Sequence, residues 1–300
     1  MRELFSILVL TVWKWRWVIK MTVDKITNYQ NKMTTNSAIN TIKDFILKGG
    51  NVNQLFKYGN SFLMAAARYK DAECAFFLLK NGADANIIDS MGNTALHYAV
   101  EFGARDVVEK LLLFPQLKIN HRNVHKVSPL DLACRFGNLD IFNLLIAQGR
   151  LIHSESAFQV ALEYRHVEIL KTFLNLGKSF DDPRLIFNSD LNIEIAKLYI
   201  DYGMDLENPN QFGETLLSHT CYHEAIQLTS LLLINGVNVN QQDYHGNTPL
   251  HIVAISGNRE LAALLLEYGA DVSIKNEHGQ LPHHHAKMFY PAGQSVFDNI

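Results

Sequence analysis

The stretch GNTPLHIVAISG, residues 246–257, decides the fold, because the chain repeats it at regular spacing. A near copy, GNTALHYAVEFG, begins at Gly92. More divergent copies begin at Gly59, Lys126, Gly213 and Gly279. The six starts lie 33, 34, 87, 33 and 33 residues apart. A recurring interval of this length indicates a stacked-repeat architecture.

The long interval of 87 residues has room for two degenerate copies. One begins at Ser154 with SESAFQVALEYR, and the other lies near Phe180 and includes DPRLIF. They span 28 and 26 residues, and both lack the turn glycine, the threonine and the leucine–histidine pair. Two interpretations stay open: these copies form a hinge, or drift has removed consensus residues while the packing survives. We expect residues 177–190 to be the least regular stretch.

Each copy has the pattern of two short helices. Thr248 can cap the backbone N–H groups of a helix that opens with Pro249. Apolar residues then recur at helical spacing, and Gly257 suits a left-handed helix end before a second, leucine-rich helix. Helices of roughly 8 to 10 residues cannot bury enough apolar surface in pairs, so the pairs are expected to stack on one another.

These residues resemble the ankyrin repeat family, whose pattern is G-x-T-P-L-H-x-A-A, then a glycine, a leucine-rich helix and G-A-D-V-N. Residues 246–257 and 261–271 match this pattern nearly residue for residue, and residues 92–103 match its first part. The resemblance implies an all-α fold, an ankyrin-repeat solenoid of stacked helix-turn-helix pairs with hairpin-like turns. It also implies that His97 and His251 form hydrogen bonds with backbone groups in the turn.

The expected organisation is an N-terminal extension followed by one repeat domain. The segments are the extension at 1–37, the repeat domain at 38–300, a half-repeat cap at 38–58, about seven repeats at 59–278 with degenerate copies near 154–212, and a partial C-terminal repeat at 279–300.

The extension begins with an apolar run, Leu4–Trp13, which is followed by tryptophans that alternate with basic residues. The run is too short for a membrane span of about 20 residues. Three interpretations stay open: a start misassigned upstream of Met21 or a disordered tail, an interfacial anchor in residues 1–20, and a signal peptide. An anchor would make the chain a membrane-associated ankyrin scaffold, so fractionation of chains started at Met1 and at Met21 distinguishes the alternatives.

The composition is that of a folded protein, with 48% hydrophobic and 19% charged residues, which excludes disordered, collagen-like and disulfide-framework chains. The net charge of −3 gives no basic field that would attract nucleic acid. Cys74, Cys134 and Cys221 have neither zinc-ligand nor redox-pair spacing. We expect them to be buried in a protein of a reducing compartment, cytoplasmic or delivered into a host cytosol.

No motif for catalysis occurs in the sequence. P-loop, G-x-S-x-G and H-E-x-x-H patterns are absent, and carboxylates are scattered singly over different repeats. His283, His284 and His285 are consecutive, so on a helix they point about 100° apart and cannot converge on one ion. We therefore expect no enzyme activity, no small-molecule substrate, no metal and no cofactor.

By resemblance, another protein is the expected partner, bound by residues beside the turn glycine and by the two residues before the glycine that closes the first helix. The residues assigned to this concave face are Tyr58, Arg68, Tyr69, Met91, Glu101, Phe102, His125, Arg135, Phe136, Phe212, Tyr222, Tyr244 and His245. Tyr69, Phe102 and Phe136 recur in successive repeats, about 10 Å apart. Aromatic and arginine side chains are enriched at binding hot spots. Aromatics are also common filler at this place in the family, so a functional stripe and ordinary packing between repeats both stay open.

Leu78 to Asn86 resembles the L-x5-D-x-N pattern around asparagines that are hydroxylated in many eukaryotic ankyrin domains, so Asn86 is a candidate for that modification. High Asn and Ile usage resembles ankyrin proteins of intracellular bacteria and large viruses, which suggests a noncatalytic effector that binds a host protein.

Overall fold

The computed structural model describes residues 35–148, 155–177 and 193–289. Within these ranges the regular elements are helices, and no strand occurs. Their bounds are α2 Thr35–Leu47, the short 3-10 turn η1 Lys57–Gly59, α3 Phe62–Arg68, α4 Ala72–Lys80, α5 Ala95–Glu101, α6 Arg105–Leu112, α7 Pro129–Arg135, α8 Leu139–Ile146, α9 Glu155–Glu163, α10 Val167–Asn175, α12 Ile193–Asp201, α13 Leu216–Tyr222, α14 Ile226–Ile234, α15 Pro249–Ser256, α16 Arg259–Glu267 and α17 Pro282–Phe289. The prediction of an all-α fold of recurring helix pairs is confirmed.

Two expected features fall largely outside the described residues. These are the apolar run within residues 1–20 and the stretch at 177–190, of which only residue 177 is described. Helix α2 begins at Thr35, three residues before the expected start of the repeat domain at residue 38.

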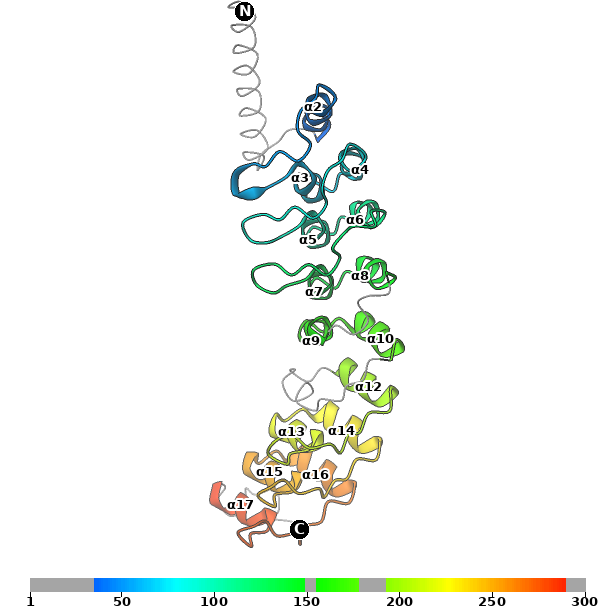
Figure 1. Ribbon diagram of the computed structural model, residues 1–300. Coiled ribbons are helices and arrows are strands. Elements are labelled where there is room, and N and C mark those ends of the chain that lie inside the picture. Colours follow the sequence, from blue (N-terminus) through cyan, green and yellow to red (C-terminus); the bar gives the residue numbers. More distant parts are fainter. Residues whose placement is uncertain (1–34, 149–154, 178–192, 290–300) are drawn as a thin grey trace, which may run out of the picture. The chain divides into compact units, whose positions relative to one another are not determined.

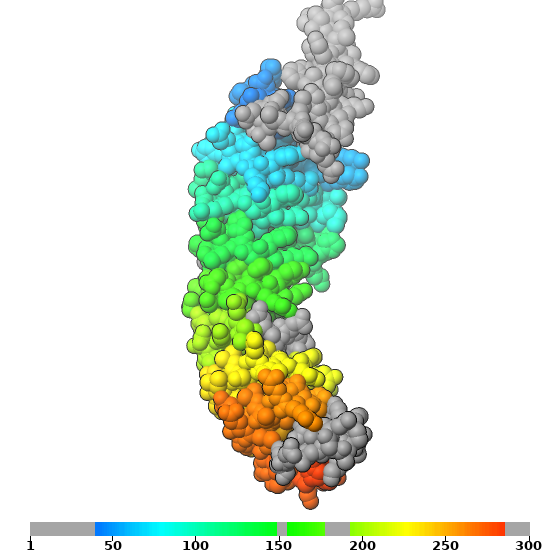
Figure 2. Space-filling view, turned by 180° about the vertical axis from the view of Figure 1, so that it is seen from behind, coloured from blue at the N-terminus to red at the C-terminus, as the bar shows by residue number. Residues whose placement is uncertain are grey.

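The chain divides into two compact units, residues 1–164 and 165–300. In the first unit, each inner helix contacts the next, in the order α3, α5, α7 and α9, and each outer helix does the same, in the order α2, α4, α6 and α8. Figure 1 shows α3, α5, α7 and α9 in one column and α4, α6 and α8 in a second. Successive pairs form stacked bands of colour in Figure 2, from cyan to green.

The second unit is built in the same way. Inner helices α13, α15 and α17 contact one another in sequence, and α10, α12, α14 and α16 form the corresponding outer series. The contacts run between neighbours in the chain, as expected when each repeat buries its apolar face only against the repeats on either side.

Side-chain caps start the inner helices where the sequence predicts them. The Thr94 and Ser128 side chains each accept a hydrogen bond from the backbone N–H three residues on, and the side chain of that third residue accepts one from the backbone N–H of Thr94 or Ser128, which completes a capping box. Thr248 forms the same box with His251, whose Nδ1 lies 3.1 Å from the Thr248 backbone nitrogen. An N-cap of this kind contributes about 1 kcal/mol.

The core lies between successive pairs. In α5, Leu96, Ala99 and Val100 are buried, and the small Ala99 lets neighbouring inner helices approach closely. In α6, Val107 and Leu111 are buried on the face that meets the other helices. Burial of each large aliphatic side chain stabilises the fold by about 1.5 to 3 kcal/mol, so removal of one repeat would expose such residues in both of its neighbours.

A finger joins one pair to the next, and an Asp or Asn side chain shapes its tip. The Asp89 Oδ1 accepts hydrogen bonds from the backbone nitrogens of Met91 at 2.8 Å and Asn93 at 2.9 Å. Asn123, Asn210, Asp243 and Asn276 accept equivalent pairs of bonds in the other fingers. The predicted hairpin-like turns therefore exist as side-chain-supported turns with left-handed residues at their tips.

Neighbouring fingers also touch through backbone. The Glu277 N–H donates to the His245 carbonyl at 3.0 Å, and Gly246, with φ of 74°, lies against the next finger. A Cβ atom on Gly246 would come 2.8 Å from the Glu277 backbone nitrogen. Gly236, with φ of 80°, follows the end of α14, and a Cβ atom added there would meet no atom within 4 Å.

This pair of glycines gives a test of finger-to-finger contact. We expect Gly236→Ala to cost about 1 kcal/mol, the penalty for a left-handed alanine. Gly246→Ala should cost about 2 kcal/mol or more, since the methyl group also clashes with the next backbone. Urea titration of both variants measures the difference, and equal losses would contradict the close approach.

Candidate functional site

All thirteen residues predicted for the concave face are exposed. In the first unit they come from two places, the finger tips with Tyr58, Met91 and His125, and the C-terminal ends of the inner helices. The helix ends place a charged residue and then an aromatic one before each left-handed turn. These pairs are Arg68 and Tyr69, Glu101 and Phe102, and Arg135 and Phe136.

The structure adds one pair that the sequence reading missed. Helix α9 ends with Glu163, and Tyr164 follows it. Arg165 then has a φ of 60°, as the glycines do in the regular copies. The sequence did contain a signal for this pair, which is its distance from a buried alanine. Ala161 lies three residues before Tyr164, just as Ala66 lies three residues before Tyr69. The prediction assigned no contact residues to this copy, because the copy lacks the turn glycine, the threonine and the leucine–histidine pair.

The aromatics at these helix ends are partly buried and partly exposed. Tyr69, Phe102, Phe136 and Tyr164 are exposed by 46, 43, 52 and 40%. About half of each ring therefore packs on the repeats and half remains accessible to a partner. Both interpretations from the sequence, packing and recognition, are compatible with this placement, and the role in binding stays a prediction.

Two arginines in this row lie against aromatic rings. The Arg68 guanidinium lies 3.9 Å from the centre of the Tyr98 ring, and that of Arg135 lies 5.5 Å from the Tyr164 ring. The Tyr98 hydroxyl in turn donates a hydrogen bond to Asp89, whose other oxygen shapes the finger tip. Guanidinium groups held on rings present fixed N–H groups to carboxylates, with less side-chain entropy to lose on binding.

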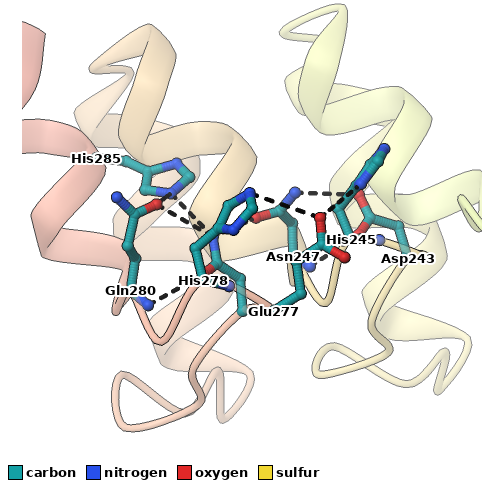
Figure 3. A network of polar contacts seen from close by, with 8 residues as sticks. Asp243, His245, Asn247, Glu277, His278, Gln280 and His285 are labelled. Atoms are coloured by element: carbon teal, nitrogen blue, oxygen red, sulfur yellow. Dashed lines mark hydrogen bonds and ion pairs between the residues drawn. The ribbon is translucent and has the colours of Figure 1, made fainter.

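The second unit carries a different surface. Phe212, Tyr222 and Tyr244 are its most exposed predicted aromatics. At the fingers, His245 Nδ1 lies 3.0 Å from Glu277 Oε1, and His278 Nε2 lies 3.6 Å from the same oxygen (Figure 3). The Glu277 carboxylate, which accepts a hydrogen bond from the protonated ring, raises the pKa of His245. This surface therefore combines aromatics with imidazole and carboxylate groups rather than with arginines.

The histidines of the T-x-L-H positions have the structural role that the resemblance implied. The buried His97 accepts a hydrogen bond from the Thr94 backbone at Nδ1, so its proton lies on Nε2 and is donated to the Val127 carbonyl at 3.2 Å. His251 bridges in the same way to the Gln280 carbonyl at 3.1 Å. His284 accepts from the Leu281 N–H and takes the corresponding place in the last helix.

Asp131 replaces the histidine in α7 and makes the same two connections, one to the start of its own helix and one to the next repeat. Its Oδ2 accepts from the Ser128 N–H at 2.8 Å, and its Oδ1 accepts from the Ser156 hydroxyl of the following repeat at 2.7 Å. The carboxylate is buried, and Arg122 lies 3.3 Å away. A negative charge is tolerated there because an arginine and three hydrogen bonds compensate the lost hydration.

The remaining candidates for chemistry do not assemble into a site. In the part of the chain that the structure describes, no group of three His, Cys, Asp or Glu side chains is placed to hold a metal ion. The three cysteines are free and buried, and burial raises the pKa of both Cys74 and Cys221 to about 12. Among the described helices, none is long and apolar enough to cross a membrane.

Asn86 lies half-buried in the loop after α4 and joins it to the next loop. Its amide donates to the Gln116 carbonyl at 2.9 Å and accepts from the Lys118 N–H at 2.8 Å. Asn53 and Asn240 make the same pair of bonds in other repeats. Hydroxylation of Asn86 stays a hypothesis. Intact-mass measurement after exposure to a eukaryotic asparaginyl hydroxylase tests it, and no added oxygen would contradict it.

Stacked helix pairs joined by fingers, with exposed residues recurring at each repeat, define the class of helical repeat proteins. The chain belongs to the ankyrin repeat family, since the family model described as ankyrin repeats in three copies matches residues 33–123 and 185–276, more than half of its length. Ankyrin repeats are generally modules for protein–protein interaction.

Several known proteins are similar over part of this chain. Neurogenic locus notch homolog protein 1 of Xenopus tropicalis is 39% identical over 100 residues, which cover 33% of this chain and 4% of that protein. Human neurogenic locus notch homolog protein 2 is 32% identical over 151 residues, 48% of this chain and 6% of its own length. The crystal structure of the human ASB11 ankyrin repeat domain is similar over 88% of this chain and 91% of its own, at 24% identity and a TM-score of 0.42. This chain thus spans only a small fraction of the notch proteins.

Acid should destabilise the repeats through their buried and partly buried histidines. Burial lowers the pKa of His97, His219, His251 and His285 below the usual 6.5. Below about pH 6.5 the unfolded chain then binds more protons than the folded chain, so the free energy of unfolding falls as the pH drops. We expect a lower urea midpoint at pH 5.5 than at pH 7.5.

Two matched variants test whether His251 contributes to this pH dependence of stability. His251→Gln keeps a side chain that can complete the capping box but removes the titration, so it should weaken the pH dependence. His125→Gln, at an exposed finger tip, should leave the pH dependence as it is. A urea midpoint that is constant between pH 7.5 and 5.5 in the unaltered chain would refute this account.

Proposed function

We propose that the chain is a noncatalytic binding module that holds a partner protein on the exposed inner-helix ends and finger tips of its repeats. One observation carries the proposal. All thirteen side chains assigned to that face are exposed, and the aromatics among them are large apolar groups that a folded domain would otherwise bury. The face combines partly buried aromatic side chains with arginines, and these are the residue types enriched at binding hot spots.

The hydrogen bonding of the buried ionisable groups favours binding over catalysis. The buried ionisable groups of the described repeats, such as His97 and Asp131, are occupied by hydrogen bonds that hold neighbouring repeats together. Catalytic groups would instead need access to a substrate and a matched acid or base nearby. We assign these residues to stability. We also propose that the chain acts in the cytoplasm or, as an effector of an intracellular bacterium or virus, in a host cytosol. No small molecule, nucleic acid or cofactor is part of this proposal.

Substitution of the helix-end aromatics tests the surface directly. The triple variant Tyr69→Ser, Phe102→Ser and Phe136→Ser should keep the helical circular dichroism spectrum, because these rings lie at helix ends and are about half exposed. Capture of the native partner should fall by about tenfold or more, the usual consequence of losing several aromatic contacts. Affinity purification from cells of the source organism, with quantitative mass spectrometry, compares the two chains.

The control keeps the number of substitutions but moves them away from the proposed surface. Exposed residues of the outer helices, Glu73, Asp106 and Asp140, are replaced by Ser. This variant should capture the partner as the unaltered chain does. Equal capture by the aromatic variant and the unaltered chain would exclude the aromatic surface as the binding site.

A further inference from the structure

Exposed charges alternate in sign along the inner-helix ends of the first unit. The residue in this position is Arg68 in α3, Glu101 in α5, Arg135 in α7 and Glu163 in α9. All four are exposed, and each is followed by one of the half-exposed aromatics. The surface thus presents one charge and one ring per repeat, and the sign of the charge reverses at each step. We call these four pairs the helix-end row.

The spacing of the row restricts the conformation of a partner. Adjacent inner helices contact each other, so equivalent residues recur at about the helix-packing distance of 10 Å. A polyproline-II segment has three residues per turn and a rise of about 3.1 Å, which places every third side chain on one side at about 9 Å intervals. In a β-strand, residues three apart point to opposite faces. In an α-helix, side chains seven residues apart recur on one face at about 10.5 Å, so the spacing excludes a β-strand but fits both a helix and a polyproline-II segment, and the rings of the row decide between these two.

The rings of the row also suit this conformation. Polyproline-II segments dock in grooves lined with aromatic side chains, and their backbone loses little entropy on binding. Between the rings, Arg68 and Arg135 are held on Tyr98 and Tyr164, so their planar N–H groups are positioned for carboxylates. Glu101 lies between these two cations and requires the opposite charge from the partner.

Ion pairing between successive charges of the helix-end row explains their alternation less well than recognition of a ligand does. Successive charges about 10 Å apart are separated by about one Debye length at physiological salt, and exposed ion pairs contribute little to stability. The alternating charges therefore have more effect on a ligand that lies directly over them than on each other.

We propose that the helix-end row binds a polyproline-II segment of a partner protein that carries a charged side chain at every third residue, acidic and basic in turn. Acidic groups lie over Arg68 and Arg135, and basic groups lie over Glu101 and Glu163. This inference rests on the proposed function and specifies the chemistry of the partner at the same surface.

Three fluorescein-labelled peptides test the register and the charge pattern on the full chain. The first carries Glu, Lys, Glu and Lys separated by Pro-Pro. The second carries the same charges separated by three prolines, which rotates successive charges away from one side. The third carries four Glu residues separated by Pro-Pro. Fluorescence anisotropy should show the first peptide bound about fivefold or more tightly than the other two, as expected from several matched ion pairs.

A charge reversal then tests the assignment of the row. Glu101→Arg places three arginines in succession, so the all-Glu peptide should become the tightest of the three. Glu101→Gln is the matched control, and it should weaken binding of the alternating peptide without reversing the preference. Circular dichroism and urea titration establish that each variant folds as the unaltered chain does.

Failure of this inference can be told apart from failure of the proposed function. Equal binding of all three peptides, no binding of any, or an unchanged preference in Glu101→Arg overturns the polyproline-II assignment. If capture of the native partner still depends on Tyr69, Phe102 and Phe136, the binding surface itself stands. Loss of that dependence overturns both.

Discussion

No helix pair in this chain can bury its own apolar face, and the structure follows from that constraint. Each pair completes its core against the pairs on either side, and the polar groups do the same. His97 satisfies its ring nitrogen with the Val127 carbonyl one repeat on, and Asn86 satisfies its amide with the Gln116 carbonyl and the Lys118 N–H in the next loop. Stability is therefore shared between neighbours, and no single repeat holds it.

This dependence on neighbours makes the repeat positions unequal. Positions between helices accept small or aliphatic residues such as Ala99 and Leu96, because packing leaves no room for others. Positions at the helix ends are exposed and can carry any charge, so Arg68 and Glu101 occupy equivalent places. A regular scaffold with freely varied exposed positions can be adapted to a particular partner without loss of the core. The two units differ in this way, since arginines and rings dominate one surface and aromatics with imidazole groups the other.

Departures from the repeat pattern show which interactions the fold requires and which residue types are optional. Asp131 replaces the usual histidine yet makes the same two connections, to its own helix start and to the next repeat. Arg165 replaces a closing glycine and still adopts a positive φ. In both cases the packing of neighbouring residues imposes the geometry, and the residue that replaces the usual one adopts it. The sequence analysis assigned no contact residues to this copy because it lacks the consensus residues at its start, and so it missed Glu163 and Tyr164, although the backbone there follows the regular copies.

The sequence by itself determined the helix pairs, their order, the caps at Thr94 and Thr248 and the exposed places of the predicted contact residues, because these depend on local patterns that recur every 33 or 34 residues. Tertiary structure decided what depends on contacts across repeats. It placed Arg68 on Tyr98 and Arg135 on Tyr164, set Gly246 against the next finger, and aligned four alternating charges at one repeat spacing. Such contacts join residues about 30 positions apart, and their geometry arises only when the helices pack.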